Sequence, residues 1–179
     1  MMKVVSSRFG TYEIPEEKII IFPEGILGFE DEKRYVILED GADSPFKWLH
    51  ALDNPDLAFI IIDPRLFYPS YEIVLSKDDG EKLSLQNPED AVVYAIVVIP
   101  EDPSQMTANL QAPLVINSQN RVGRQVVLSD SRYSLKHKIL SKAKAPQAAG
   151  SGGHKGKGAG QGKRARAAAD TDMAVRMAR

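Results

Sequence analysis

Short apolar runs recur along the first 140 residues of the chain, and turn-forming residues separate them. Runs rich in β-branched and aromatic residues, bounded by Gly, Pro, Asn and Asp, are typical of β-strands. They predict strands at Lys18–Phe22, Tyr35–Glu39, Phe46–Leu52, Leu57–Asp63, Tyr71–Leu75, Ala91–Ile99, Leu114–Asn117 and Gln125–Leu128. Helical periodicity is weak, and it predicts one turn at Pro88–Ala91 and one terminal helix at Ser131–Leu140. The pattern therefore predicts an all-β fold, a small antiparallel β-barrel-like domain with one or two short helices.

One of these runs has no charge from Val92 to Ile99, which predicts a central strand that is buried on both faces. Its expected partner is the strand at 57–62. An uncharged, β-branched strand at the edge of a sheet would invite aggregation. We therefore expect the sheet to be closed or covered.

Charge divides the chain into two parts. Residues 1–140 contain 14 Lys and Arg against 22 Asp and Glu, a net charge of −8, whereas residues 141–179 contain 9 against 2, a net charge of +7. The second part holds seven of the 13 glycines and no aromatic residue. Such a segment buries too little apolar surface to offset the entropy of ordering it. We expect a domain at 1–140 and a disordered Gly/Ala/Lys/Arg-rich tail at 141–179, in which only Ala165–Arg179 could form a short helix.

Length and composition narrow the class of protein. The 179 residues fit one ordinary domain with some chain left over. The longest apolar runs fall far short of the roughly 20 residues that span a bilayer. The first residues lack the apolar core of a secretory signal, and the absence of cysteine excludes disulfides, thiolate metal sites and thiol nucleophiles. We expect a cytoplasmic protein with no membrane partner.

Histidine gives little support for catalysis. His154 lies in the glycine-rich tail, and His137 lies between two lysines that supply no carboxylate to orient it. His50 follows Trp48 and Leu49 in a predicted strand and is expected to pack there. No Gly-x-Ser-x-Gly segment supplies a nucleophile. We predict no catalytic residues, no enzyme activity and no small-molecule substrate.

Metal and cofactor motifs are weak as well. The histidines are too far apart in the sequence to act as paired metal ligands. The acidic residues at 30–32 and 78–79 are most simply interpreted as solvent-exposed turn residues. The segment Gly158–Arg164 resembles a phosphate-binding loop superficially. However, Lys157 stands where the first glycine belongs, and Arg164 replaces the Ser or Thr that would hold magnesium. We predict no metal site and no cofactor.

The basic tail suggests an alternative function. Lysine and arginine on a flexible chain release counterions from phosphate, so the tail could bind RNA. It has no aromatic residue for base stacking, and the acidic domain repels a phosphate backbone. The alternative is a nucleic-acid-associated β-barrel protein whose tail makes weak, non-specific RNA contacts.

Several segments in the domain carry a family resemblance. The segment Ser104–Asn117 contains Thr-Ala-Asn-Leu-Gln-Ala-Pro followed by an apolar strand that ends in Asn. The other segments are Phe22–Glu30, Ser44–Leu49, Leu57–Phe59, Asp63–Pro64, Tyr71–Glu72 and Gly123–Leu128 with Tyr133. Together they resemble the flagellar assembly factor family FliW over about residues 2–140. Leu27 stands where the family often has Pro before Gly28, and the basic tail has no counterpart in the resemblance.

The resemblance implies a non-catalytic regulator of bacterial flagellum assembly and biogenesis. A protein of this kind binds flagellin in the cytoplasm, as a chaperone does. When flagellin is exported, it binds the RNA-binding translational repressor CsrA instead. By binding CsrA, the protein then prevents CsrA from repressing translation of the flagellin mRNA. It does so non-competitively, from a site remote from the RNA-binding surface of CsrA. An acidic domain suits a partner with a basic RNA-binding surface.

The candidate residues form two sets. The partner-binding set is Phe29, Glu30, Asn54, Phe59, Asp63, Tyr71 and Glu72. The structural-motif set is Gly25, Gly28, Thr107, Asn109, Leu110, Pro113 and Asn117. Phe29 could instead fold back onto the core, Glu72 could lie on a solvated strand face, and the Asn54 and Asp63 turns could simply end strands. Trp48 and Phe59 are most simply core residues, although Phe59 stays in the partner-binding set.

Overall fold

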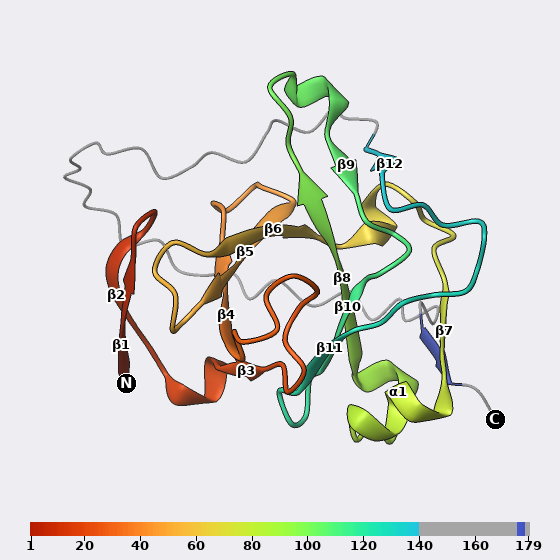
Figure 1. Cartoon of the computed structure of the whole chain (residues 1–179), viewed down its shortest axis with the longest axis horizontal. Coiled ribbons are helices and arrows are strands. Elements are labelled where there is room, and N and C mark those ends of the chain that lie inside the picture. The colour runs from red at the N-terminus through yellow and green to blue at the C-terminus, as the bar shows by residue number, and fades with distance from the viewer. Residues whose placement is uncertain (140–174, 178–179) are drawn as a thin grey trace.

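A curled antiparallel sheet forms the body of the protein. The computed structural model describes residues 1–139 and 175–177 (Figure 1). The strands of the main sheet follow the order β11-β10-β8-β6-β5-β4-β3. They are β3 (Ile20–Ile21), β4 (Arg34–Glu39), β5 (Phe46–Ala51), β6 (Ala58–Ile62), β8 (Ala91–Val98), β10 (Leu114–Asn117) and β11 (Gly123–Gln125). Two further strands, β9 (Thr107–Ala108) and β12 (His137–Lys138), pair with each other, and β9 also pairs with β8. The predicted all-β, barrel-like fold is confirmed.

The two ends of the strand order meet in a seam. The backbone N–H of Ile21 donates to the carbonyl of Arg121 at 2.9 Å, and Ile21 forms a parallel bridge with Val122, just before β11. Beside this seam the Phe22 ring lies against Gly123, where an added Cβ would sit 2.6 Å from the ring. The seam satisfies edge backbone groups that an open sheet would expose.

The central strand β8 pairs with β6 through Ile60↔Val97 and with β10 through Leu114↔Tyr94. This confirms the predicted pairing of 92–99 with 57–62. The predicted burial on both faces is wrong, because Val92 is 37% exposed and Val98 61% exposed. Side chains alternate between the faces of a strand. These two valines lie on the face that the described residues leave uncovered at the ends of β8.

A hairpin that the apolar-run analysis did not predict precedes the main sheet. It consists of β1 (Met2–Ser6) and β2 (Gly10–Ile14), at the left of Figure 1. Its Val4 and Ile14 pack against Val36 of β4 in a small separate cluster. Phe9 at the hairpin tip meets the ring of Trp48 edge-on at 5.4 Å, and the Arg8 guanidinium lies 4.7 Å from the centre of the Trp48 ring. The hairpin therefore covers one side of the barrel.

Within residues 1–139 and 175–177 the helices are few and short. They are α1 (Lys77–Lys82) and the 3₁₀ turns η1 (Glu16–Lys18), η2 (Pro64–Leu66), η3 (Pro88–Asp90) and η4 (Pro103–Gln105). The turn η3 confirms the predicted helical turn. Asp78 and Asp79, interpreted from the sequence as turn residues, lie in α1 instead. The reason is a local cap, because Ser76 Oγ accepts from the Asp79 N–H at 3.1 Å.

The helix predicted at Ser131–Leu140 is wrong for the residues that the structure describes. Residues 131–136 form turns and irregular chain, and His137–Lys138 form β12. Buried Tyr133 bonds through its hydroxyl to the backbone of Glu72, and the Ile139 N–H donates to Met106 at 3.1 Å. These long-range bonds hold the chain extended against the sheet.

The last pair of strands joins distant parts of the sequence. β7 (Ile73–Leu75) pairs in parallel with β13 (Val175–Met177), at the right of Figure 1. β13 lies in the region predicted as a tail with a possible helix, and these three residues form a strand instead because the edge of β7 offers them backbone partners. The rest of the predicted tail, 141–174 and 178–179, lies outside the described residues. Among the described residues, no helix is both long enough and apolar enough to span a bilayer.

The seam generates a first prediction. Gly123→Ala should lower the free energy of unfolding by about 1–3 kcal/mol, because the new Cβ overpacks the Phe22 ring. Denaturant unfolding of both proteins measures the difference. In a Phe22→Leu background the ring is gone, so the same substitution should cost clearly less. An equal cost in both backgrounds would show that the ring contact does not set the requirement for glycine.

Candidate protein-interaction surface

The loop at 22–33, between β3 and β4, carries two of the partner-binding candidates. Gly25 and Gly28 adopt φ values of 68° and 88°, in the left-handed region that favours glycine. A Cβ on Gly25 would lie 2.6 Å from Glu30 Cα, so the loop folds tightly on itself there. The Gly28 N–H donates to Glu30 Oε1 at 2.9 Å. These two glycines therefore set the position of Phe29 and Glu30.

Phe29 combines the two alternatives that its sequence left open. Its ring meets the ring of Phe59 edge-on at 5.3 Å, yet 41% of Phe29 remains exposed. Half-buried Phe59, from β6, packs against the core cluster that contains Tyr35. Leu27, in the same loop, is 62% exposed. We call Leu27, Phe29 and Phe59 the loop patch, in which the two rings contact each other and Leu27 lies in the same loop as Phe29.

Acidic side chains follow the loop patch along the chain. The Gly28 backbone N–H holds the pKa of the Glu30 carboxyl below its usual value. Asp31 and Glu32 follow directly, and none of these three carboxylates forms an ion pair within the described part of the chain. An apolar patch with an acidic border suits a partner that presents apolar and basic side chains.

Asn54 and Asp63 bond to local backbone. Asn54 Oδ1 accepts from the Asp56 N–H at 3.1 Å in the turn after β5. Asp63 Oδ1 accepts from the Arg65 N–H at 2.9 Å and caps η2 after β6. Both arrangements fit the alternative in which these residues end strands.

Tyr71 and Glu72 occupy different environments although they are adjacent. Tyr71 is 1% exposed and donates its hydroxyl to the Leu110 carbonyl at 2.6 Å, and burial raises its pKa. Its side chain therefore lies in the core and offers no surface to a partner. Glu72 is partly exposed and pairs with Arg176 of β13. The structure brings Phe29, Glu30 and Phe59 together, but it places Tyr71 and Glu72 directly before β7, where Tyr71 belongs to another core cluster.

The residues of the structural-motif set bond mainly to backbone. Asn109 Oδ1 accepts from the Ala112 N–H at 2.9 Å, and the carbonyl of Pro113 accepts from Val126. Buried Asn117 donates to the carbonyls of Leu83 and Ser84 at 3.0 and 3.2 Å and accepts from Gln119 at 2.9 Å. Thr107 lies half-buried in β9, and Leu110 is fully buried. These contacts join the 107–117 segment to the residues that directly follow α1 and β11.

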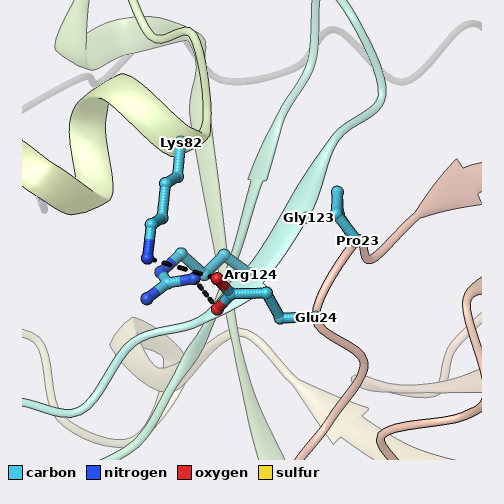
Figure 2. A pocket seen from close by; sticks show the side chains of 5 residues that line it. All are labelled: Pro23, Glu24, Lys82, Gly123 and Arg124. Carbon is cyan, nitrogen blue, oxygen red and sulfur yellow. Dashed lines mark hydrogen bonds and ion pairs between the residues drawn. The ribbon is translucent and has the colours of Figure 1, made fainter.

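A small cavity contains charged residues that the sequence analysis missed (Figure 2). Pro23, Glu24, Lys82, Gly123 and Arg124 line it. Glu24 pairs with Arg124 and with Lys82 Nζ, the latter at 3.2 Å, and Arg124 Nε also donates to Asp79 at 2.7 Å. Lys82 and Arg124 hold the pKa of Glu24 below its usual value. Because the charges neutralise one another, the cluster tethers the 22–33 loop to α1 and β11.

No spacing in the sequence could have revealed this cluster, since its members come from three distant segments. Metal ligation finds no support either: in residues 1–139 and 175–177 no group of three or more His, Cys, Asp or Glu is placed to hold an ion.

His50 is a packed strand residue. It is fully buried in β5, and its Nδ1 lies 2.7 Å from the Tyr12 hydroxyl of the hairpin. Burial lowers the pKa of His50 and raises the pKa of Tyr12 to about 12. The hydrogen bond of the His50 ring goes to a phenol rather than to a carboxylate, so the ring links the hairpin to the barrel.

Comparison with known proteins identifies the family to which this architecture belongs. The FliW protein family matches residues 3–139. The chain belongs to the FliW family. A flagellar assembly factor FliW from Thermoanaerobacter pseudethanolicus is 42% identical over 144 residues, covering 80% of this chain and 96% of that protein. One from Syntrophus aciditrophicus is 45% identical over 139 residues, covering 78% and 88%.

A solved structure agrees. The crystal structure of a flagellar assembly factor FliW matches with a TM-score of 0.73 and 36% identity, over 79% of this chain and 99% of that one. The resemblance inferred from the sequence is thus confirmed. The FliW match ends at residue 139, so β13 lies outside it.

The environment of His50 generates a second prediction. The pKa of folded His50 lies below its ordinary value of 6.5, so the unfolded chain binds more protons as the pH falls below that value. The contribution of His50 to the free energy of unfolding is therefore present above about pH 6.5 and is lost as the pH falls toward the lower folded pKa. Below the folded pKa the contribution changes no further.

Denaturant unfolding between pH 7.5 and about pH 5 measures this effect as the difference between the unaltered chain and a His50→Gln variant. The difference should shrink as the pH falls. A His137→Gln variant, which keeps His50, is the control and should retain the slope. A pH-independent difference between the unaltered chain and His50→Gln would contradict the argument.

Proposed function

We propose that this FliW-family protein is a non-catalytic cytoplasmic regulator that binds flagellin and, alternatively, the translational repressor CsrA. CsrA binding antagonises repression of flagellin mRNA translation. The observation that carries the proposal is the family match, which spans almost all of the described domain. The family match assigns the protein to flagellar assembly, and binding to flagellin and CsrA is the proposed mechanism.

Charge supports this choice of partners. The domain at 1–140 has a net charge of −8. Long-range attraction speeds encounter with a basic, RNA-binding protein, and repulsion of the negatively charged RNA backbone weakens direct binding of RNA to the domain itself. If CsrA is inhibited from a site remote from its RNA-binding surface, bound RNA must weaken binding of this protein by the same factor.

The loop patch is the proposed contact surface. Phe29 is exposed enough to be covered by a partner, and Phe59 and the loop glycines hold it in place. Aromatic side chains are enriched at protein–protein interfaces, where a few buried aromatic anchors commonly dominate the binding energy. The ionised carboxylate of Glu30 beside it orients a basic partner group.

Calorimetric titration of the full chain at about 0.15 M salt tests the proposed function. We expect 1:1 binding to purified flagellin and to CsrA, with flagellin displacing CsrA, and far weaker binding to RNA. An absence of binding to both proteins refutes the proposal. RNA affinity that exceeds both protein affinities and falls steeply with salt favours the RNA-binding alternative.

Substitution of the loop patch gives a third prediction. Phe29→Ala should weaken binding of at least one partner by about ten-fold or more, the cost of losing a packed aromatic contact. The fold should be retained, because Phe29 is only partly buried. Leu66→Ala is the matched control, since Leu66 is 61% exposed on η2. Equal affinities for the two variants would remove the loop patch from the interface.

A further inference from the structure

The edge of β7 accommodates an extended strand. β7 and β13 form a two-stranded sheet that is separate from the main sheet. Their parallel register aligns Val175 with Ile73, Arg176 with Val74 and Met177 with Leu75. β13 consists of residues 175–177, which lie outside the domain at 1–139. The edge of β7 therefore pairs with a segment that this domain does not itself supply.

The apolar side chains of β13 fill two positions in the domain. Val175 is 3% exposed and belongs to the largest core cluster, and Met177 packs against the same cluster. A Cβ on Gly80 would lie 3.3 Å from Met177 Cε, so glycine in α1 leaves room for the end of this side chain. Two apolar residues, two positions apart in β13, therefore pack against the domain.

The residue between them forms an ion pair with the domain. Arg176 is exposed, and its guanidinium pairs with the carboxylate of Glu72, whose side chain is 33% exposed. Glu72 itself is held by the Tyr133 hydroxyl, which accepts from its N–H at 3.0 Å and donates to its carbonyl at 2.9 Å. The anchored backbone fixes the acidic group that a basic residue meets.

Two cavities adjoin β13. One cavity includes Ser76, Glu81, Leu85 and Met177 in its walls, and the other includes Val74, Asp130, Tyr133 and Arg176. A docking groove for a segment longer than three residues would have this form. Strand addition to an exposed edge combines backbone hydrogen bonds with pockets for alternate side chains.

We propose that the edge of β7 is a docking site for an extended protein segment with a basic residue between two apolar residues. In the free protein Val175–Met177 occupies the site as an intramolecular competitor. Only three residues pair, and one side chain, Val175, is fully buried, so a partner segment can displace them. The proposal concerns a different surface from the loop patch and does not require flagellin or CsrA to be the partner.

A labelled peptide with the sequence of residues 171–179 tests the site by fluorescence anisotropy against the full-length protein. The peptide should bind the Val175→Asp variant at least ten-fold more tightly than the unaltered chain, because a site that is occupied in cis lowers the apparent affinity for a segment in trans. Val98→Asp is the matched control, since Val98 is an exposed valine on β8, a strand of the main sheet that does not pair with β7. It should leave peptide affinity unchanged.

Charge exchange tests the chemistry. In the Val175→Asp background, Glu72→Lys should weaken the peptide by about ten-fold, and a peptide carrying Arg176→Glu should restore binding. Circular dichroism confirms that each variant is folded. Equal affinity for a scrambled peptide, or for the unaltered and Val175→Asp proteins, overturns the proposal. A concentration-dependent dimer that Val175→Asp abolishes also overturns it, since β13 would then occupy a second copy.

Discussion

Closure of the sheet between β3 and the start of β11 is the constraint on which the other features depend. The Ile21 bridge to Val122 and the Phe22 ring on Gly123 bring together segments about 100 residues apart in sequence. The 22–33 loop leaves the sheet directly after this seam, and Arg124 follows it on the other side. The loop patch and the charged cluster therefore both derive their positions from the closed barrel.

Much of the barrel could be predicted because most of its strands lie in runs rich in β-branched and aromatic residues, whereas the strand predicted at Gln125–Leu128 overlaps the observed β11 (Gly123–Gln125) in one residue only. β5, β6, β8 and β10 lie within the predicted strands, and the pairing of β6 with β8 follows from their lack of charge. The hairpin β1–β2 was missed although Val4, Tyr12 and Ile14 show a partial alternation. The helix α1 was missed because Asp-Asp-Gly is typical of turns, whereas the Ser76 cap and its interactions with the domain favour a helix.

The site was only partly predictable, for a physical reason. Turn glycines and an exposed aromatic leave a local signal, so Gly25, Gly28 and Phe29 could be selected from the sequence. Burial of Tyr71, the charged cluster around Arg124 and the pairing of Glu72 with Arg176 depend on contacts between distant segments. A sequence supplies Glu72 as a candidate for a basic partner, but only the fold shows that a basic residue of the same chain already meets it.

The placement of Trp48 determines what optical spectroscopy can observe in this molecule. It is the one tryptophan of the chain, it is 4% exposed, and its Nε1 donates to Asp40 at 2.9 Å while Phe9 covers its ring. Its emission therefore monitors the attachment of the amino-terminal hairpin to the barrel. Events at the opposite side of Figure 1, where β7 meets β13, call for an extrinsic reporter.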